Sequence, residues 1–162
     1  MIASDMIAAA KVVDCLPSLR RALGTDVPAG PEGGTITVTK FYALRALAER
    51  DRTAGELARS IVVTLPTLTQ VVDGLVEREW VERYPDRSDR RKVWLRLSEK
   101  GREVYSHARE VAEQRVAETI DHLSEAERQS LVEGLEALRA AIHAQRIQGQ
   151  ARPEADGHKN RV

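Results

Sequence analysis

Two helix-start signals in close succession constrain the fold of this chain more than any other feature. Thr53 and Glu56 have the spacing of a capping box, in which a hydroxyl and a carboxylate satisfy backbone donors at a helix N-terminus. The helix that they begin is short and is expected to end near Ser60. Thr64 then caps a second helix that has Pro66 in its first turn. Two short helices joined by a tight turn predict a helix-turn-helix motif.

A β-hairpin is predicted directly after this motif. Trp80 to Tyr84 and Lys92 to Leu97 have the pattern of strands, and the Pro-Asp-Arg-Ser-Asp run between them is typical of a turn. The whole chain has 25 basic and 25 acidic residues, so a basic surface must be local. The hairpin provides one, because the basic residues between its strands and along the second strand outnumber the acidic ones. These residues are Arg87, Arg90, Arg91, Lys92 and Arg96, against Asp86 and Asp89.

The remainder of the chain is predicted to be helical. Hydrophobic residues make up 42% of the sequence but aromatic residues only 4%, which suits packed helices better than a β-sandwich. A first amphipathic helix is expected over residues 1–23, bent or restarted at Pro17. The Gly- and Pro-rich stretch 24–34 is expected to hold no regular element. A further helix is predicted within 36–51.

The C-terminal part begins with Ser98, which is predicted to cap a long helix. Ser124 and Glu127 form a second capping box at the start of the last helix. Apolar residues follow in that helix at heptad spacing, and one small domain can hardly cover them, so we expect a second copy of the chain to do so. The expected dimer interface consists of Leu16, Leu19, Leu131, Leu135, Leu138 and Ile142.

The predicted fold class is therefore mainly α with a small β-hairpin wing. It is a winged helix-turn-helix with N- and C-terminal dimerisation helices. The expected organisation is an N-terminal dimerisation helix and loop (1–35), a winged helix-turn-helix DNA-binding lobe (36–98), C-terminal dimerisation helices (99–147) and a disordered tail (148–162).

An arginine-tipped hairpin beside a helix-turn-helix indicates binding to duplex DNA. One helix enters the major groove while guanidinium groups reach the minor groove and the phosphates. Asp86 and Asp89 are expected to orient the arginines by bidentate pairing. The candidate DNA-binding residues are Thr64, Thr67, Thr69, Gln70, Arg87, Arg90, Arg91 and Lys92.

The stretch from about residue 36 to 101 resembles the MarR family of transcriptional regulators. The runs ITVTKFYALRAL, TAGELARSIVVTLPTLTQVVDGL and DRSDRRKVWLRLSEKG carry the resemblance, and the last contains the family's wing signature at Asp89, Arg91, Leu97 and Ser98. The resemblance implies a homodimer formed by interleaved first and last helices, with Arg90 and Arg91 entering the minor groove of a near-palindromic operator.

Two positions depart from the family pattern. Gln70 stands where the family usually has Arg, which weakens the expectation of a strong contact there. Glu79 stands where Gly usually follows the recognition helix. A non-Gly residue in the left-handed conformation costs about 1 kcal/mol, so the turn into the wing is expected to differ slightly from that of the family.

The resemblance also implies a ligand-responsive repressor that binds a small aromatic or lipophilic effector. The residues expected to line its pocket are Arg20, Arg21, Phe41, Tyr42 and His107. Cys15 leaves open a redox-sensing regulator, although its neighbours include no aromatic residue, and a buried, inert Cys15 is favoured. A helical protein-interaction module without DNA binding is a further alternative, which salt-dependent binding to DNA would exclude.

Other functional classes find little support in the sequence. The four His residues show no HxxxH spacing and there is one Cys, so we expect no dedicated metal site. No Gly-rich phosphate loop or GxSxG motif is present, and we expect no enzyme activity and no cofactor. The chain has neither 18 consecutive apolar residues nor a basic N-terminal leader, which predicts a cytoplasmic protein without a membrane partner.

Overall fold

The computed structural model describes residues 3–30, 34–86, 88–89 and 92–150. The chain divides into two compact units, residues 1–119 and 120–162, and each is described by itself. The helices are α1 (Ala3–Leu23), α2 (Val38–Glu49), α3 (Ala54–Ile61), α4 (Leu65–Val76), α5 (Glu99–Ile120) and α6 (Glu125–Gln150). The strands are β1 (Asp26–Pro28), β2 (Thr35–Thr37), β3 (Arg52–Thr53), β4 (Val81–Pro85) and β5 (Val93–Leu97).

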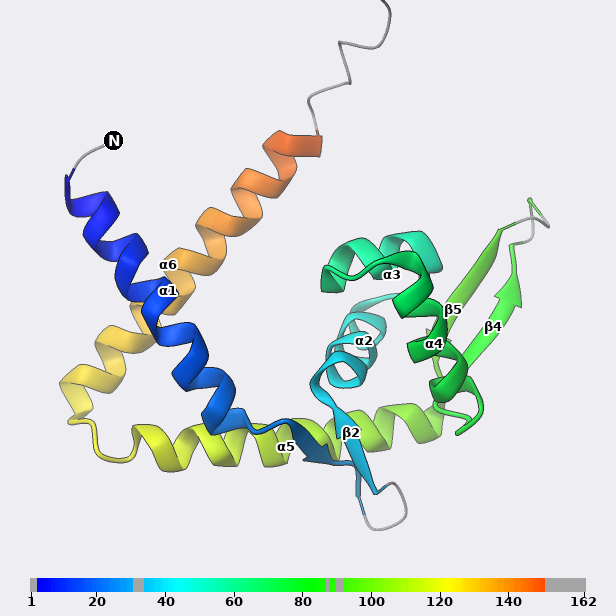
Figure 1. The fold of residues 1–162 in the computed structure, drawn as a ribbon, viewed down its shortest axis with the longest axis horizontal. Coiled ribbons are helices and arrows are strands. Elements are labelled where there is room, and N and C mark those ends of the chain that lie inside the picture. Colours follow the sequence, from blue (N-terminus) through cyan, green and yellow to red (C-terminus); the bar gives the residue numbers. More distant parts are fainter. Residues whose placement is uncertain (1–2, 31–33, 87, 90–91, 151–162) are drawn as a thin grey trace, which may run out of the picture. The chain divides into compact units, whose positions relative to one another are not determined.

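The predicted winged helix-turn-helix is confirmed. α3 and α4 follow one another across a short turn, and the hairpin of β4 and β5 extends beside α4 (Figure 1). The sheet has the order β3-β5-β4 and is antiparallel throughout, with Val81 opposite Leu97 and Pro85 opposite Val93. Buried aliphatic side chains from α2, α3, α4 and β5 form its core, including Leu44, Leu57, Leu68, Leu75 and Leu95.

The helix caps expected from the sequence are also confirmed. The backbone N–H of Thr53 donates to Glu56 Oε2 at 2.8 Å, and the N–H of Glu56 donates back to Thr53 Oγ1 at 3.4 Å. The hydrogen bond from the Thr53 backbone is the main reason that the pKa of Glu56 is lowered. Ser124 and Glu127 repeat this capping box before α6.

The end of α4 is a Schellman motif. The N–H of Trp80 donates to the carbonyl of Leu75 at 2.9 Å, and the N–H of Glu79 donates to that of Val76 at 2.8 Å. Glu79 has φ 62°, so this non-Gly residue adopts the left-handed conformation in spite of its cost. Trp80 is only 2% exposed and closes the motif from the core side.

Ser98 joins this helix end to the start of α5. Its N–H donates to the Trp80 carbonyl at 3.0 Å, and its hydroxyl donates to the Glu79 carbonyl at 2.6 Å while accepting from the N–H of Gly101 at 2.9 Å. A Cβ on Gly101 would overlap the Trp80 carbonyl oxygen and lie 3.0 Å from Leu97 Cδ1. Only Gly at position 101 lets α5 start this close to the Trp80 backbone.

α5 also contacts the C-terminal end of α1. The Arg115 guanidinium on α5 donates from Nη1 to the carbonyl oxygens of Leu23, at 2.7 Å, and Asp26, at 3.0 Å. Gly24, with φ 79°, lies between them, and a Cβ there would come within 2.9 Å of Arg115 Nη1. These bonds satisfy a free carbonyl at the helix C-terminus with a cation, as the helix dipole favours.

Three expectations about the N-terminal half are corrected. The stretch 24–34 does contain a regular element, because Val27 is buried within β1 and pairs with Ile36 of β2, and Pro28 is the last residue of β1. α1 continues through Pro17 without a restart. Cys15 is exposed, so the expectation of a buried thiol is wrong for the single chain.

The last helix is longer than the sequence predicted. α6 reaches Gln150, and residues 151–162 of the expected tail lie outside the described residues. Among the described helices, none has both the length and the apolar character needed to cross a membrane.

Replacing Gly101 by Ala is expected to destabilise the protein, because the new methyl group must displace the Trp80 carbonyl or the Leu97 side chain. Overpacking of this kind costs about 1–3 kcal/mol. Thermal unfolding followed by circular dichroism measures the change. Gly55→Ala is the matched control, since its Cβ would meet only Arg59 Nη1 at 3.9 Å and Ala favours a helix over Gly. Equal melting temperatures for Gly101→Ala and the parent would contradict a close contact at Gly101.

Candidate nucleic-acid interface

The N-terminal end of α4 presents the residues expected to contact DNA. Thr64, Thr67, Thr69 and Gln70 are all exposed. The hydroxyls of Thr64 and Thr67 form one hydrogen bond, with their oxygen atoms 2.8 Å apart, and the Thr69 hydroxyl donates to the Leu65 carbonyl at 3.0 Å. These hydroxyls are therefore partly engaged within the protein, and they present methyl groups, acceptor lone pairs and one remaining O–H donor to a ligand.

The wing presents Lys92, which is exposed, but Arg87, Arg90 and Arg91 lie outside the described residues. The hairpin is closed below its tip by two backbone bonds. The N–H of Asp86 donates to the Lys92 carbonyl at 2.9 Å, and the N–H of Lys92 donates to the Asp89 carbonyl at 2.8 Å. These two bonds join the two ends of the segment 86–92, which contains the three arginines in the sequence.

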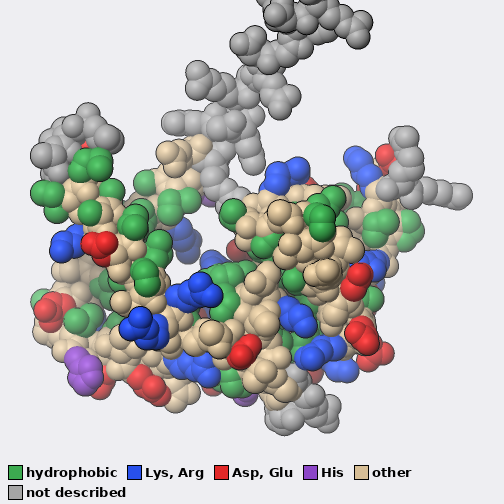
Figure 2. Space-filling model, in the orientation of Figure 1, with side chains coloured by type: hydrophobic (Ala, Val, Ile, Leu, Met, Phe, Trp, Pro, Cys, Tyr) green, Lys and Arg blue, Asp and Glu red, His purple; other side chains and the backbone are tan. Residues whose placement is uncertain are grey.

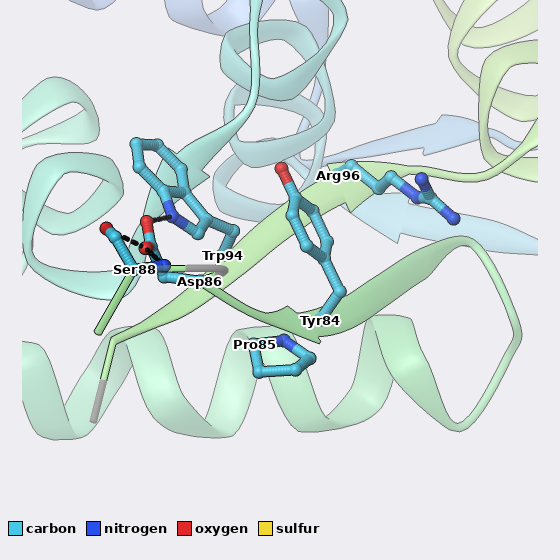
Figure 3. Close-up of a pocket in the computed structure, with 6 residues that line it drawn as sticks. All are labelled: Tyr84, Pro85, Asp86, Ser88, Trp94 and Arg96. Atoms are coloured by element: carbon cyan, nitrogen blue, oxygen red, sulfur yellow. Dashed lines mark hydrogen bonds between the residues drawn. The ribbon is translucent and has the colours of Figure 1, made fainter. Parts of the chain in front are cut away.

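Asp86 holds the turn together (Figure 3). One carboxylate oxygen accepts from the Ser88 N–H at 2.7 Å, the Ser88 hydroxyl at 2.6 Å and the Asp89 N–H at 3.0 Å. The other accepts from Trp94 Nε1 at 2.6 Å. The Ser88 hydroxyl, followed by the Trp94 indole, lowers the pKa of Asp86 far below its ordinary value, so this carboxylate stays ionised near neutral pH.

The described contacts of Asp86 thus differ from the role expected for it. The sequence suggests pairing with arginine, whereas these bonds run to the turn backbone and to an indole. For Asp89 the orienting role stays a prediction. Tyr84, Pro85, Asp86, Ser88, Trp94 and Arg96 line an open hollow of about 400 Å³ on this face of the wing (Figure 3).

Two side-chain contacts that no sequence pattern predicted join the wing to α4 and to the residues just before β3. Arg83 on β4 forms an ion pair with Asp73 on α4, with Nη2 and Oδ1 2.5 Å apart. Tyr84 donates its hydroxyl to Asp51 at 2.7 Å, which is the main cause of its raised pKa. Exposed ion pairs contribute little to stability, so the contact of Arg83 with Asp73 matters mainly for orientation.

The residues expected around an effector are partly brought together. The ring of Phe41 lies 5.8 Å, centroid to centroid, from both Tyr42 and Tyr105. Tyr105 was not anticipated. The remaining expected residues are Arg20, Arg21 and His107. Both arginines are exposed and the histidine is half-buried.

This arrangement of a short helix pair, a three-stranded sheet and a closed hairpin defines a winged helix-turn-helix protein. The sequence profile of the MarR family matches residues 35–92. The HTH-type transcriptional regulator YpoP of Bacillus subtilis is 32% identical over 95 residues, which cover 58% of this chain and 67% of the relative. The chain belongs to the MarR family of DNA-binding transcriptional regulators, which are not enzymes.

Solved structures share this fold. The transcriptional regulator BldR of Sulfolobus solfataricus matches with a TM-score of 0.63 and 26% identity, over 87% of this chain and 99% of BldR. BpsR of Bordetella bronchiseptica, whose DNA binding is regulated by 6-hydroxynicotinic acid, matches with a TM-score of 0.61 and 24% identity, over 80% of this chain and 98% of BpsR. The likeness to BpsR is one of fold.

Replacing Trp94 by Phe is expected to weaken DNA binding about fivefold while leaving the protein folded. Phe keeps a ring in the hollow but loses the Nε1–H that binds Asp86, and a hydrogen bond of this kind contributes about 1 kcal/mol. Fluorescence anisotropy with a labelled duplex measures the affinity.

Tyr105→Phe is the matched control for this variant and is expected to bind duplex as the parent does. It also removes one polar group from an aromatic side chain, but Tyr105 lies on α5, outside the wing. If Trp94→Phe binds duplex as tightly as the parent, the contact of Trp94 with Asp86 does not organise the wing for DNA.

Proposed function

We propose that this chain is a ligand-responsive repressor that binds a near-palindromic operator as a homodimer. The observation that carries the proposal is the exposed N-terminal end of α4 lying beside a basic wing that is tied to it. The Arg83 to Asp73 ion pair and the Schellman motif at Glu79 fix that relation.

The proposed mode of binding assigns one groove to each element. The N-terminal end of α4 enters the major groove, where Thr64, Thr67 and Thr69 approach phosphates and bases, and Gln70 bonds an adenine edge. Lys92 and the wing arginines contact the minor groove and its phosphates. A homodimer carries two recognition helices related by a two-fold axis, so the operator is expected to contain two half-sites related in the same way. Their centres would lie about 34 Å apart, which is one turn of the duplex.

Homodimerisation is supported by apolar side chains that the single chain leaves uncovered. Figure 2 shows hydrophobic side chains along α1. Leu16 is 56% exposed and Leu135 is 56% exposed, and the same exposure extends along each helix. Every described position of α6 except Arg128 is exposed. Most of the stability of a helix in a protein comes from packing of its apolar face, so a second copy is the occupant that we propose. The uncovered residues of the expected interface are Leu16, Leu19, Leu131, Leu135, Leu138 and Ile142.

A small aromatic or lipophilic acid is the effector that we propose. Phe41 and Tyr42 offer ring faces, and Arg20, Arg21 and His107 offer groups that bind a carboxylate. The regulation of BpsR by 6-hydroxynicotinic acid shows that this fold can host such control in another protein. Calorimetric titration with salicylate is expected to give heat and to release bound DNA. Absence of both effects would contradict an effector of this class.

Replacing Arg90 and Arg91 together by Ala is expected to lower duplex affinity at least tenfold. Each lost phosphate contact also lowers the slope of log K against log salt by about 1, because fewer counterions are released. Anisotropy at several salt concentrations measures both quantities.

Arg109→Ala serves as the control for these variants, since Arg109 lies on α5 and pairs with Glu113 at 2.6 Å. Unchanged affinity in the double variant would remove the wing from the interface. A parent protein that shows no salt-dependent binding to any duplex would favour the protein-interaction alternative.

Replacing Leu135 by Asp is expected to dissociate the dimer, because a carboxylate would be buried without a partner in the interface. Light scattering after size exclusion should show about twice the 18.0 kDa chain mass for the parent and a shift toward the chain mass for the variant. Glu136→Ala, one residue along α6, is expected to leave the mass unchanged. A parent of 18.0 kDa at micromolar concentration would overturn the dimer.

A further inference from the structure

The turn between α3 and α4 carries exposed apolar side chains. Val62 is 88% exposed, the largest value among the exposed large hydrophobic residues of the part of the chain that the structure describes, and Leu65 is 52% exposed. Pro66 is exposed beside them. The other strongly exposed apolar residues lie mostly on α1 and α6, where a second copy accounts for them. That explanation does not extend to the helix-turn-helix.

The backbone conformation at position 62 is also one that Val rarely adopts. Val62 ends α3 with φ 58° and ψ 52°, the left-handed conformation. A β-branched residue is strained in that region, whereas Gly or Asn adopts it readily. The neighbouring Ile61 and Val63 pack against the core, and their burial accounts for them. Neither the backbone conformation nor burial favours Val at position 62. This points to a contact between its side chain and a molecule that binds the protein.

The hydroxyls at this end of α4 are partly used within the protein. Thr64 and Thr67 bond to one another, and Thr69 donates to the Leu65 carbonyl. What the turn presents outward is therefore largely aliphatic. Such a surface complements neither a phosphate nor a base edge that offers only hydrogen-bonding groups.

In duplex DNA, one feature of the major groove is apolar, namely the C5 methyl group of thymine. We propose that Val62 and Leu65 contact thymine methyl groups and so determine which bases the operator carries at the start of each recognition helix. The inference rests on the proposed DNA-binding function and adds to it the base that is recognised. It commits to duplex DNA because these two residues flank Thr64, which caps the recognition helix of a DNA-binding family.

The experiment replaces thymine by deoxyuridine, which pairs identically but lacks the C5 methyl group. A duplex is first selected from a random pool by the parent protein, and each thymine of the selected site is then replaced singly. We expect about fourfold weaker binding at one or more positions in each half-site, as the loss of one buried methyl group predicts.

Val62→Gly and Leu65→Ala are the test variants. In a double-mutant cycle, each is expected to bind the thymine and deoxyuridine duplexes with affinities that differ by less than twofold at the position it contacts. Val62→Gly relieves the left-handed strain, so its melting temperature should be no lower than that of the parent although its affinity for the thymine duplex falls. Gln70→Ala is the matched control, which lowers affinity for both duplexes and keeps their ratio.

The outcomes separate this inference from the function on which it rests. If the parent selects a duplex with salt-dependent affinity but no deoxyuridine substitution weakens it, the thymine contact is wrong and DNA binding stands. The same holds if both variants keep the parent's ratio, or if they alter the light-scattering mass, which would make the turn a protein contact. If the parent selects no duplex at all, both the function and the inference fall.

Discussion

The position of the DNA-binding elements depends on the meeting of three backbones at Trp80. Its N–H closes the end of α4, its carbonyl accepts from Ser98, and Gly101 leaves room for α5 against that same carbonyl. The indole of Trp80 is buried in the core. It therefore fixes the positions of three elements relative to one another, namely the recognition helix, the first wing strand and the long helix. The wing and α4 thereby keep one relative orientation, which the proposed contact of each with its own groove requires.

Features that depend on neighbouring residues could be predicted from the sequence. The caps at Thr53, Thr64, Ser98 and Ser124 each depend on residues within three positions, and all four are present. The family resemblance drew attention to position 79, where Gly is usual, but it did not predict that Glu79 adopts the left-handed conformation itself. The family resemblance added the wing signature, whose Ser98 joins two helices in the structure.

The features that were missed involve short elements or distant partners. β1 and β3 are too short to show a periodic pattern, and β1 is recognisable only because Val27 pairs with Ile36. The bond from Trp94 to Asp86 and the ion pair of Arg83 with Asp73 join residues on different elements, so no spacing rule reveals them. A carboxylate beside arginines looks like their partner in a sequence, although an indole and a turn backbone can bind it equally well.

The long helix α5 connects two distant parts of the chain. Near its C-terminal end, the Arg115 guanidinium donates to the last carbonyl of α1 and to the first carbonyl of β1, while the N-terminal end of α5 is fixed at Trp80. Displacing the end of α1 must therefore either break the bond of Arg115 to Leu23 or move α5 with it. α1 and the C-terminal end of α4 are thus joined through α5 by an unbroken series of covalent and hydrogen bonds.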